Sequence, residues 1–186
     1  MTTKAALRAQ GLTARAALAD RPARSAAACA HLLRWLAVHA PDAVLAGYVP
    51  IRGEADPRPA LAAHRGPTCL PVVEGPARPL AFRLWRPGQG LEAGAFGTKQ
   101  PHAFAEVIQP QVVIVPLAAF DCRGGRIGYG GGYYDRSLES LRAGGPVLAL
   151  GFGFAAQQVE TVPEGGHDQP LDLMVTEDGI LNPVRS

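Results

Sequence analysis

The sequence predicts an α/β protein, a three-layer α/β/α sandwich with a largely parallel mixed sheet and a helical N-terminus. Short apolar runs recur along the chain, and the clearest is Val-Val-Ile-Val-Pro at positions 112–116. Uniformly apolar runs are typical of strands that are buried on both faces of a parallel sheet. Helical segments separate these runs, and this alternation favours a sandwich. We expect a single domain over residues 1–186, a length that is ample for one packed core.

The first forty residues predict two helices. Ala, Leu and Arg dominate positions 3–39, and a break falls at positions 20–22, where the sequence reads Asp-Arg-Pro. Ser25 precedes an Ala-rich run, and serine is a favoured N-cap because its hydroxyl accepts a hydrogen bond from a free N–H of the first turn. We therefore expect the second helix to begin at Ser25.

After Pro41 the pattern changes to strands and short helices. Apolar or alternating runs predict strands at 43–49, 68–73, 80–85, 112–116 and 147–152, and a last strand at 171–176. Between them, a short helix is predicted at 59–64, and a second helix continues over 137–142. Because proline donates no backbone hydrogen bond, Pro71 predicts an edge strand or a strand end. The Gly- and Pro-rich stretch 86–109 predicts an ordered loop.

Charge and cysteine content exclude several classes of protein. The formal net charge is +2 and the basic residues are scattered, so nucleic acid is not an expected partner. The three cysteines lie far apart without a Cys-x-x-Cys pair, which predicts neither a disulfide framework nor a structural zinc site. No signal-peptide pattern and no bilayer-spanning run is present, so we expect a cytoplasmic protein with no membrane partner.

One glycine-rich run, positions 126–135, is the candidate active-site loop. It reads Arg-Ile-Gly-Tyr-Gly-Gly-Gly-Tyr-Tyr-Asp and precedes a predicted helix. Glycines let backbone N–H groups turn toward phosphate oxygens, and a helix N-terminus adds positive partial charge. Arg126 and Arg136 offer fixed positive charges. The run matches neither a Walker A loop nor a dinucleotide fingerprint; the alternative is a plain glycine-rich turn, which its four glycines and three tyrosines disfavour.

Further residues around this run are recognisable: Val-Pro at 115–116, Ala-Phe-Asp at 119–121 and the unbroken segment 125–136. Together they closely resemble the signature of the 5-formyltetrahydrofolate cyclo-ligase (methenyltetrahydrofolate synthetase) family, and the resemblance covers nearly the whole chain. It implies an enzyme that uses ATP and Mg²⁺ to cyclise 5-formyltetrahydrofolate to 5,10-methenyltetrahydrofolate, releasing ADP and phosphate. ATP would phosphorylate the formyl oxygen, and N10 would then attack the activated carbon.

The resemblance assigns nucleotide-binding residues to the N-terminus and to the loop. Lys4 and Arg8 match a Lys-x-x-x-Arg element whose members contact ATP, and a spacing of four puts both on one helix face. A solvated helix end is the alternative for this pair. In the loop, the resemblance implies ATP contacts from Arg126, Ile127, Gly128, Tyr129, Gly130, Gly131, Gly132, Tyr133 and Tyr134. Arg126 and Tyr133 are also the expected catalytic residues.

Two residues near the first predicted strand are implied to hold the folate. Val49 would contact the pterin, and the Glu54 carboxylate would accept N–H bonds from its aminopyrimidine edge. An exposed loop acid is the alternative for Glu54. The resemblance also implies folate contacts from Tyr129, Gly130, Gly131, Gly132 and Tyr133. The substrate is 5-formyltetrahydrofolate, which can carry a polyglutamate tail, and we expect a monomer or a weak homodimer.

Two carboxylates match family residues that help to bind magnesium. They are Asp135, at the end of the loop, and Asp168. Hard oxygen ligands suit Mg²⁺, which completes its shell with water and phosphate oxygens. In one respect the chain departs from bacterial family members, which often carry an acid where this chain has Ala155 and Ala156. The departure leaves the role of Gln157 open.

Two rival functions remain open from the sequence. A sugar-phosphate isomerase or CoA transferase would have a similar α/β outline, but it needs a dedicated catalytic carboxylate and no ATP. A catalytically silent nucleotide- or folate-binding relative would show a broken loop or a missing magnesium ligand. Among the aromatic residues, Trp85 is explained equally well by core packing and by stacking on the ligand, and Phe96 is a candidate for stacking.

Overall fold

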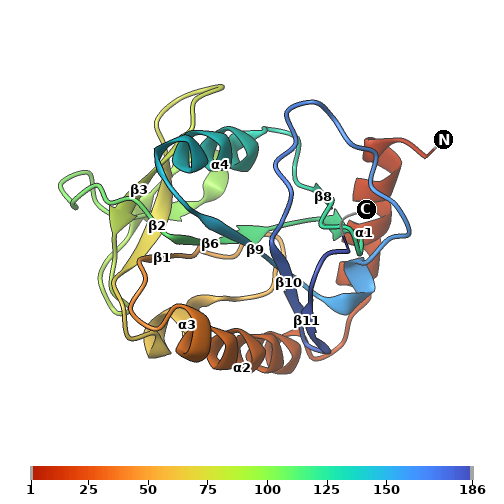
Figure 1. Cartoon of the computed structure of the whole chain (residues 1–186), viewed down its shortest axis with the longest axis horizontal. Helices are drawn as coiled ribbons and strands as arrows, with labels where there is room; N and C mark the ends of the chain where they lie inside the picture. Colours follow the sequence, from red (N-terminus) through yellow and green to blue (C-terminus); the bar gives the residue numbers. More distant parts are fainter. Residues whose placement is uncertain (1, 185–186) are drawn as a thin grey trace.

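A seven-stranded mixed sheet forms the centre of the molecule, as the computed structural model of residues 2–184 shows (Figure 1). The spatial order is β11-β10-β9-β6-β1-β2-β3. The strands are β1 (Leu45–Ala46), β2 (Thr68–Val73), β3 (Leu80–Leu84), β6 (Val112–Pro116), β9 (Leu148–Phe152), β10 (Leu173–Thr176) and β11 (Gly179–Leu181). The five inner strands pair in parallel, and the two edge strands pair antiparallel to their neighbours. The predicted, largely parallel sheet is confirmed.

Helices cover both faces of this sheet (Figure 1). On one face lie α2 (Arg21–His39) and α3 (Arg58–Ala63), and on the other lies α4 (Tyr133–Gly144). Successive side chains of a strand point to opposite faces. Accordingly, Ile114 of β6 packs in the cluster that contains Leu36 of α2, and Val113 packs in the cluster that contains Leu138 of α4. The predicted three-layer arrangement is therefore confirmed.

The N-terminal helix α1 (Lys4–Ala16) lies at one end of the sheet, beside a small hairpin (Figure 1). This hairpin consists of β7 (Ala119–Phe120) and β8 (Arg126–Ile127). Leu7 of α1 is buried in a cluster with Ile127 of β8. The approach is close, because a Cβ atom on Gly11 would lie 2.1 Å from the carbonyl oxygen of Ala118. Packing on this hairpin brings the start of α1 next to the glycine-rich run.

The second helix begins earlier than the sequence predicts. Its first residue is Arg21, and Pro22 occupies the first turn, where the missing N–H of proline would have had no intrahelical acceptor. Ser25 lies inside the helix, is buried, and accepts a hydrogen bond from the N–H of Asp56 at 3.2 Å. The expectation that Ser25 caps the helix is wrong, because its hydroxyl instead joins α2 to the segment before α3.

Pro71 does not mark an edge strand. It lies within β2, opposite Phe82 of β3, and β2 is flanked by β1 on its other side. The parallel ladder between β1 and β2 ends at the pair of Ala46 and Cys69, two residues before Pro71. The proline therefore removes no hydrogen bond from that ladder. The prediction of an edge position is wrong for this reason.

Three other boundaries differ from the predicted ones. The strand expected at 43–49 is only β1, and the strand at 171–176 is not the last, because β11 follows it. The stretch 86–109, expected as a loop, contains a short antiparallel pair and a 3-10 turn. These are β4 (Glu92–Ala93), η1 (Ala95–Gly97) and β5 (Lys99–Gln100). Such short elements are defined by tertiary contacts and have no periodic pattern of their own.

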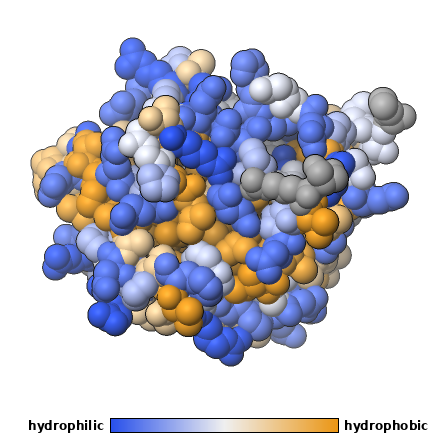
Figure 2. Space-filling model, viewed as in Figure 1, coloured by the Kyte–Doolittle hydropathy of each residue, from blue (hydrophilic) through white to orange (hydrophobic). Residues whose placement is uncertain are grey.

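The surface is mixed in character. Figure 2 shows apolar residues in a band across the middle of the viewed face, with hydrophilic residues above and below it. Two exposed aromatic residues, Phe96 and Phe104, lie in the stretch 86–109. Within residues 2–184, no helix is long and apolar enough to cross a membrane.

Candidate active site

The glycine-rich run connects the hairpin to α4. We call residues 126–135 the signature loop; Arg126 and Ile127 form β8, and α4 begins at Tyr133. Gly130 and Gly132 have φ angles of +97° and +63°, a region that residues with a Cβ atom rarely adopt. Gly132 is also the N-cap residue of α4. The glycines at these two positions are thus required by the turn that leads into the helix.

Arginine side chains hold two carbonyl groups of the signature loop. Arg8 Nε donates to the Gly128 oxygen at 2.7 Å, and Arg136 Nη2 donates to the Gly131 oxygen at 2.6 Å. Within residues 2–184, the N–H groups of the three consecutive glycines, Gly130, Gly131 and Gly132, have no protein acceptor. Unpaired amides at the start of a helix attract anions. The signature loop is therefore a candidate phosphate cradle.

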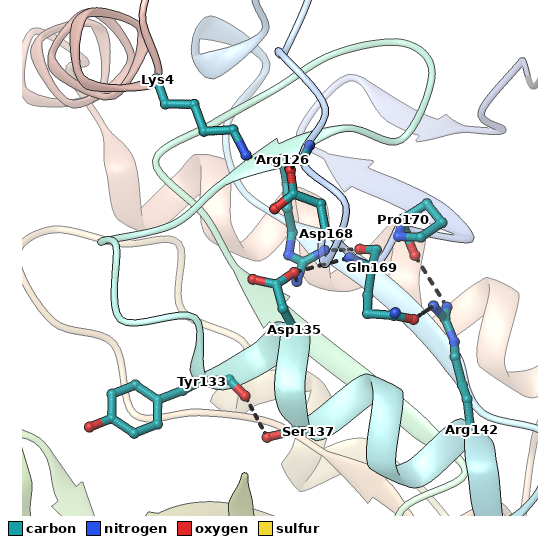
Figure 3. Close-up of polar contacts among 10 residues, drawn as sticks. Lys4, Arg126, Tyr133, Asp135, Ser137, Arg142, Asp168, Gln169 and Pro170 are labelled. Carbon is teal, nitrogen blue, oxygen red and sulfur yellow. Dashed lines mark hydrogen bonds and ion pairs between the residues drawn. The ribbon is translucent and has the colours of Figure 1, made fainter. Parts of the chain in front are cut away.

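Arg126 is committed to an ion pair at the base of the loop. Its Nη2 lies 2.5 Å from Oδ1 of Asp135, and its Nη1 donates to the carbonyl of Gln169 (Figure 3). The same Asp135 oxygen accepts from the N–H of Gln169 at 3.1 Å. Burial lowers the pKa of Arg126, while the carboxylates of Asp135 and Asp168 oppose that shift. Two acids thus lie within electrostatic range of one buried arginine.

Lys4 and Asp168 form a second ion pair beside the first (Figure 3). Oδ2 of Asp168 also accepts from the N–H of Gly165 at 2.7 Å. Each expected metal ligand therefore binds a cationic side chain, Asp135 through Arg126 and Asp168 through Lys4. Among the described residues no group of three or more His, Cys, Asp or Glu side chains could hold a metal. Two carboxylates fit Mg²⁺ when phosphate and water oxygens complete its shell.

Glu54 interacts with Tyr129 of the signature loop; Glu54, Tyr129, Arg15 and Arg52 together are called the Glu54 cluster. Glu54 is half-buried in the turn after β1, and Oε2 accepts from the N–H of Ile51 at 2.9 Å. Burial raises the pKa of Glu54; the N–H of Ile51, the Tyr129 hydroxyl, and the cations of Arg15 and Arg52 oppose that shift. The position is not that of an exposed loop acid.

The remaining residues that were expected to contact a ligand differ in how deeply they are buried. The Tyr133 ring lies 5.8 Å from the ring of Phe96, and Figure 3 shows it directed away from Arg126 and Asp135. Burial raises the pKa of Tyr134 well above its usual range, so its hydroxyl stays neutral. Val49 is partly buried against the core, and Ile127 is buried, which leaves only the backbone of Ile127 for a nucleotide contact.

Two residues whose role the sequence leaves open are structural. Trp85 is buried in the core, and its indole N–H donates to the Gln89 carbonyl at 3.2 Å. Gln157 is also buried; it donates to the carbonyls of Leu117 and Ala118 and accepts from the N–H of Phe154. All polar atoms of its amide are engaged in this way, so Gln157 replaces no missing acid.

Sequence reasoning missed two arginines in the Glu54 cluster. Arg15 Nη2 donates to the Tyr129 hydroxyl at 2.8 Å, and the Arg52 guanidinium lies 5.2 Å from the centroid of the same ring. A signal for Arg15 does exist. Positions 4, 8 and 15 fall on one face of an α-helix, so Arg15 shares a face with Lys4 and Arg8. Arg52 carries no comparable pattern.

Comparison with known proteins shows to which family the chain belongs. The model of the 5-formyltetrahydrofolate cyclo-ligase family matches residues 1–177. The chain belongs to the 5-formyltetrahydrofolate cyclo-ligase family. A solved structure, the 5,10-methenyltetrahydrofolate synthetase of Aquifex aeolicus, matches this family member with a TM-score of 0.76 at 28% identity, covering 100% of this chain and 96% of that one.

Further relatives agree with this family assignment. The 5-formyltetrahydrofolate cyclo-ligase of Haemophilus influenzae is 33% identical over 101 residues, 52% of this chain and 54% of that protein. The Escherichia coli K12 enzyme of the same name is 33% identical over 112 residues, 58% of this chain and 61% of that protein. The matched part thus spans little more than half the length of these relatives. A Mycoplasma pneumoniae 5,10-methenyltetrahydrofolate synthetase shares the fold, with a TM-score of 0.73 at 22% identity over 95% of this chain and 99% of that one.

Proposed function

We propose that this family member catalyses the ATP- and Mg²⁺-dependent conversion of 5-formyltetrahydrofolate to 5,10-methenyltetrahydrofolate, with release of ADP and phosphate. One observation carries the proposal: the signature loop contacts two chemically different clusters. Arg126 and Asp135 of the loop pair with each other beside the ion pair of Lys4 with Asp168. Tyr129 of the same loop interacts with Glu54 and Arg15. A loop that touches both a cationic, carboxylate-rich site and a half-buried acid suits phosphoryl transfer from a nucleotide to a folate.

The nucleotide side supplies positive charge and backbone donors. Lys4, Arg8 and Arg126 would neutralise the phosphates. Lys4 and Arg126 would exchange their carboxylate partners for phosphate oxygens, while Arg8 also donates through Nε to the Gly128 carbonyl. The N–H groups of the glycines would donate hydrogen bonds to the oxygens of the migrating phosphoryl group, because phosphoryl transfer is catalysed mainly by alignment and by stabilisation of charge. Asp135 and Asp168, once released, would hold Mg²⁺, which neutralises phosphate charge when bound.

The folate side supplies an acceptor for the pterin. An ionised Glu54 can accept two N–H bonds from an aminopyrimidine edge, and Val49, which packs partly buried against the core, would offer an apolar surface to the pterin. Tyr129 and Tyr133 both belong to the signature loop. Each would contact the folate where the folate packs against this loop. Tyr133 is directed away from the Arg126 pair (Figure 3), which suits a contact with the folate.

The chemistry balances without a resident base. The formyl oxygen is a poor leaving group; transfer of the γ-phosphoryl group of ATP to it yields ADP and an activated carbon. The lone pair of N10 attacks that carbon, the C–O bond breaks, and phosphate departs with the oxygen while N10 loses its proton. Arg126 would stabilise charge during the transfer and Tyr133 would hold the reacting groups in place. We include polyglutamylated substrates and a cytoplasmic monomer or weak homodimer in the proposal.

The test is a direct assay. Purified protein is mixed with 5-formyltetrahydrofolate, Mg²⁺ and ATP, and the methenyl product is followed by its absorbance. We expect product that depends on both ATP and Mg²⁺ and appears in step with ADP. Folate binding without product would identify a catalytically silent relative, and no binding or product would contradict the proposal altogether.

A further inference from the structure

Arg15 is a buried cation that neither the nucleotide side nor the folate side of the proposed mechanism uses. It lies on α1, and only 2% of its surface is exposed. Its guanidinium donates to acceptors on three separate segments: the Leu117 carbonyl at 3.5 Å, the Arg52 carbonyl at 2.9 Å and the Tyr129 hydroxyl at 2.8 Å. One side chain thus joins α1, the segment after β6, the turn after β1 and the signature loop.

The acceptors of Arg15 do not neutralise its charge. Two are carbonyls and one is a phenol, and among the described residues Arg15 has no acidic partner at ion-pair distance. Burying a cation without a carboxylate partner is unfavourable. The acid that interacts with Arg15 electrostatically is Glu54. The position of Arg15 is therefore explained by the site better than by the stability of the fold.

Arg15 also fixes the turn that presents Glu54. Arg52 and Gly53 both have left-handed backbones, with φ angles of +51° and +76°, and a residue with a Cβ atom such as Arg52 adopts this conformation only when its surroundings hold it there. Arg15 holds the Arg52 carbonyl. The same arginine lies 6.0 Å from the centroid of the Tyr129 ring, and the Arg52 guanidinium lies 5.2 Å from it.

We propose that Arg15 is a positioning residue of the folate site, which fixes the Glu54 turn and the Tyr129 hydroxyl relative to each other. The inference rests on the proposed function, because it assumes that Glu54 holds the pterin. Arg15 touches neither substrate in this arrangement. Its effect is to keep the acceptor group in place before the folate arrives, so that binding requires no rearrangement of the turn.

The charge of Arg15 has a second consequence for Glu54. The groups that face Glu54 are Arg15 from α1, Arg52 from its own turn, and the hydroxyls of three tyrosines, Tyr48, Tyr129 and Tyr134. Burial raises the pKa of Glu54, and the cations of Arg15 and Arg52 oppose that rise. Without Arg15 the carboxyl group would protonate at a higher pH, and a protonated carboxyl accepts N–H bonds poorly.

The test compares Arg15→Gln and Arg15→Lys in the complete protein. We measure KM for 5-formyltetrahydrofolate and KM for ATP between pH 6 and pH 8. Arg15→Gln should raise KM for the folate by about tenfold, the loss expected for a hydrogen bond to a charged group, with KM for ATP nearly unchanged. The ratio of variant to wild-type folate KM should grow as the pH falls. Arg15→Lys keeps the charge but not the three-pronged geometry, so it should restore the pH profile and only part of the affinity.

Arg24→Gln is the matched control. Arg24 lies on α2 and pairs with Glu177 at 2.7 Å. Neither residue belongs to the Glu54 cluster or to the ion pairs of Lys4 and Arg126, so the loss of Arg24 should leave both KM values unchanged. An Arg15→Gln variant that resembles Arg24→Gln, raises both KM values equally, or shows a pH-independent defect overturns the inference. If Arg15→Gln does not fold, Arg15→Lys decides by the same comparison. If the wild-type protein shows no turnover, both the proposed function and this inference are refuted. If the wild-type protein is active but the Arg15 variants have the same KM for the folate, only this inference is refuted.

Discussion

Lys4 and Asp168 form an ion pair although 164 positions separate them in the sequence. The pair joins the first residue of α1 to the segment before β10, and it lies beside the ion pair of Arg126 and Asp135 (Figure 3). In this arrangement the expected phosphate-binding lysine neutralises an expected metal ligand. The proposed function therefore requires these residues to exchange partners when the nucleotide binds, and the first prediction concerns the lysine.

Lys4→Ala should weaken nucleotide binding with little effect on stability. The side chains of Lys4 and Asp168 are 39% and 37% exposed, and such pairs contribute at most about 1 kcal/mol. The loss of a charged contact to phosphate should raise KM for ATP by about tenfold or more. Steady-state kinetics and a thermal melt measure the two effects. Arg65→Ala, which removes a remote exposed pair with Asp42, is the control and should change neither; an unchanged KM for ATP in Lys4→Ala would contradict the assignment.

Arg126→Ala and Asp135→Ala should both abolish most turnover but differ in stability. Loss of charge stabilisation during phosphoryl transfer should lower kcat by about 10²–10³-fold or more. The Arg126 side chain is 6% exposed and that of Asp135 is 27% exposed. Asp135→Ala leaves the charge of Arg126, the more deeply buried partner, without its carboxylate, at a cost of up to about 3 kcal/mol. It should therefore lower Tm more than Arg126→Ala does. Near-normal kcat in either variant would refute the role given to it.

Alanine at Gly132 or Gly130 should disturb the signature loop. Both glycines have positive φ angles, and a Cβ atom on Gly132 would lie 2.8 Å from Nη1 of Arg136. A residue with a Cβ atom is strained there by about 1–2 kcal/mol, so Gly132→Ala and Gly130→Ala should lower Tm and kcat together. Gly128→Ala is the control for stability alone, because a Cβ atom at that position meets nothing within 4 Å. Equal melting temperatures for all three variants would show that the backbone conformation is not needed.

How far the sequence predicts the fold depends on the length of each element. The five residues of β6 are uniformly apolar and lie at the predicted positions, because a strand buried on both faces has a pattern of its own. The sequence does not predict the hairpin of β7 and β8, because each strand has only two residues. Two residues show no period, and this hairpin depends on packing against α1 through Leu7.

The candidate site likewise contains residues that the sequence identifies and residues that only the folded structure identifies. Glycine content and flanking charge identify the signature loop, since the chemistry of those residues is local. The ion pair of Lys4 with Asp168 joins segments that only the folded chain brings together, so no sequence spacing predicts it. The sequence does not single out Arg15, because an arginine in an Ala-rich helix is usually a solvated cation. Its burial results from the close approach of α1 to the segment after β6, where Gly11 lacks the side chain that would prevent it.

Glu54→Gln should separate folate binding from stability. Burial raises the pKa of Glu54 above its ordinary value of 4.5, so the folded protein binds this proton more tightly than the unfolded chain does. Stability therefore falls as the pH rises from the ordinary value through the raised one, and the ionised carboxylate is a net cost at neutral pH. Glu54→Gln should raise Tm at pH 7, and this gain should shrink as the pH is lowered toward 4.5.

The same variant should weaken binding of the folate. The carboxylate is the expected acceptor of the pterin N–H groups, so in the wild type KM for 5-formyltetrahydrofolate should rise as the pH falls through the raised pKa of Glu54. Glutamine accepts at one oxygen only, so Glu54→Gln should have a high KM for the folate that no longer depends on pH in this range, while KM for ATP is unchanged. Melts and kinetics recorded over the same pH series measure both effects. Two results together would show that Glu54 supports the fold and does not hold the pterin: a wild-type KM for the folate that does not change with pH, and a Tm of Glu54→Gln below that of the wild type.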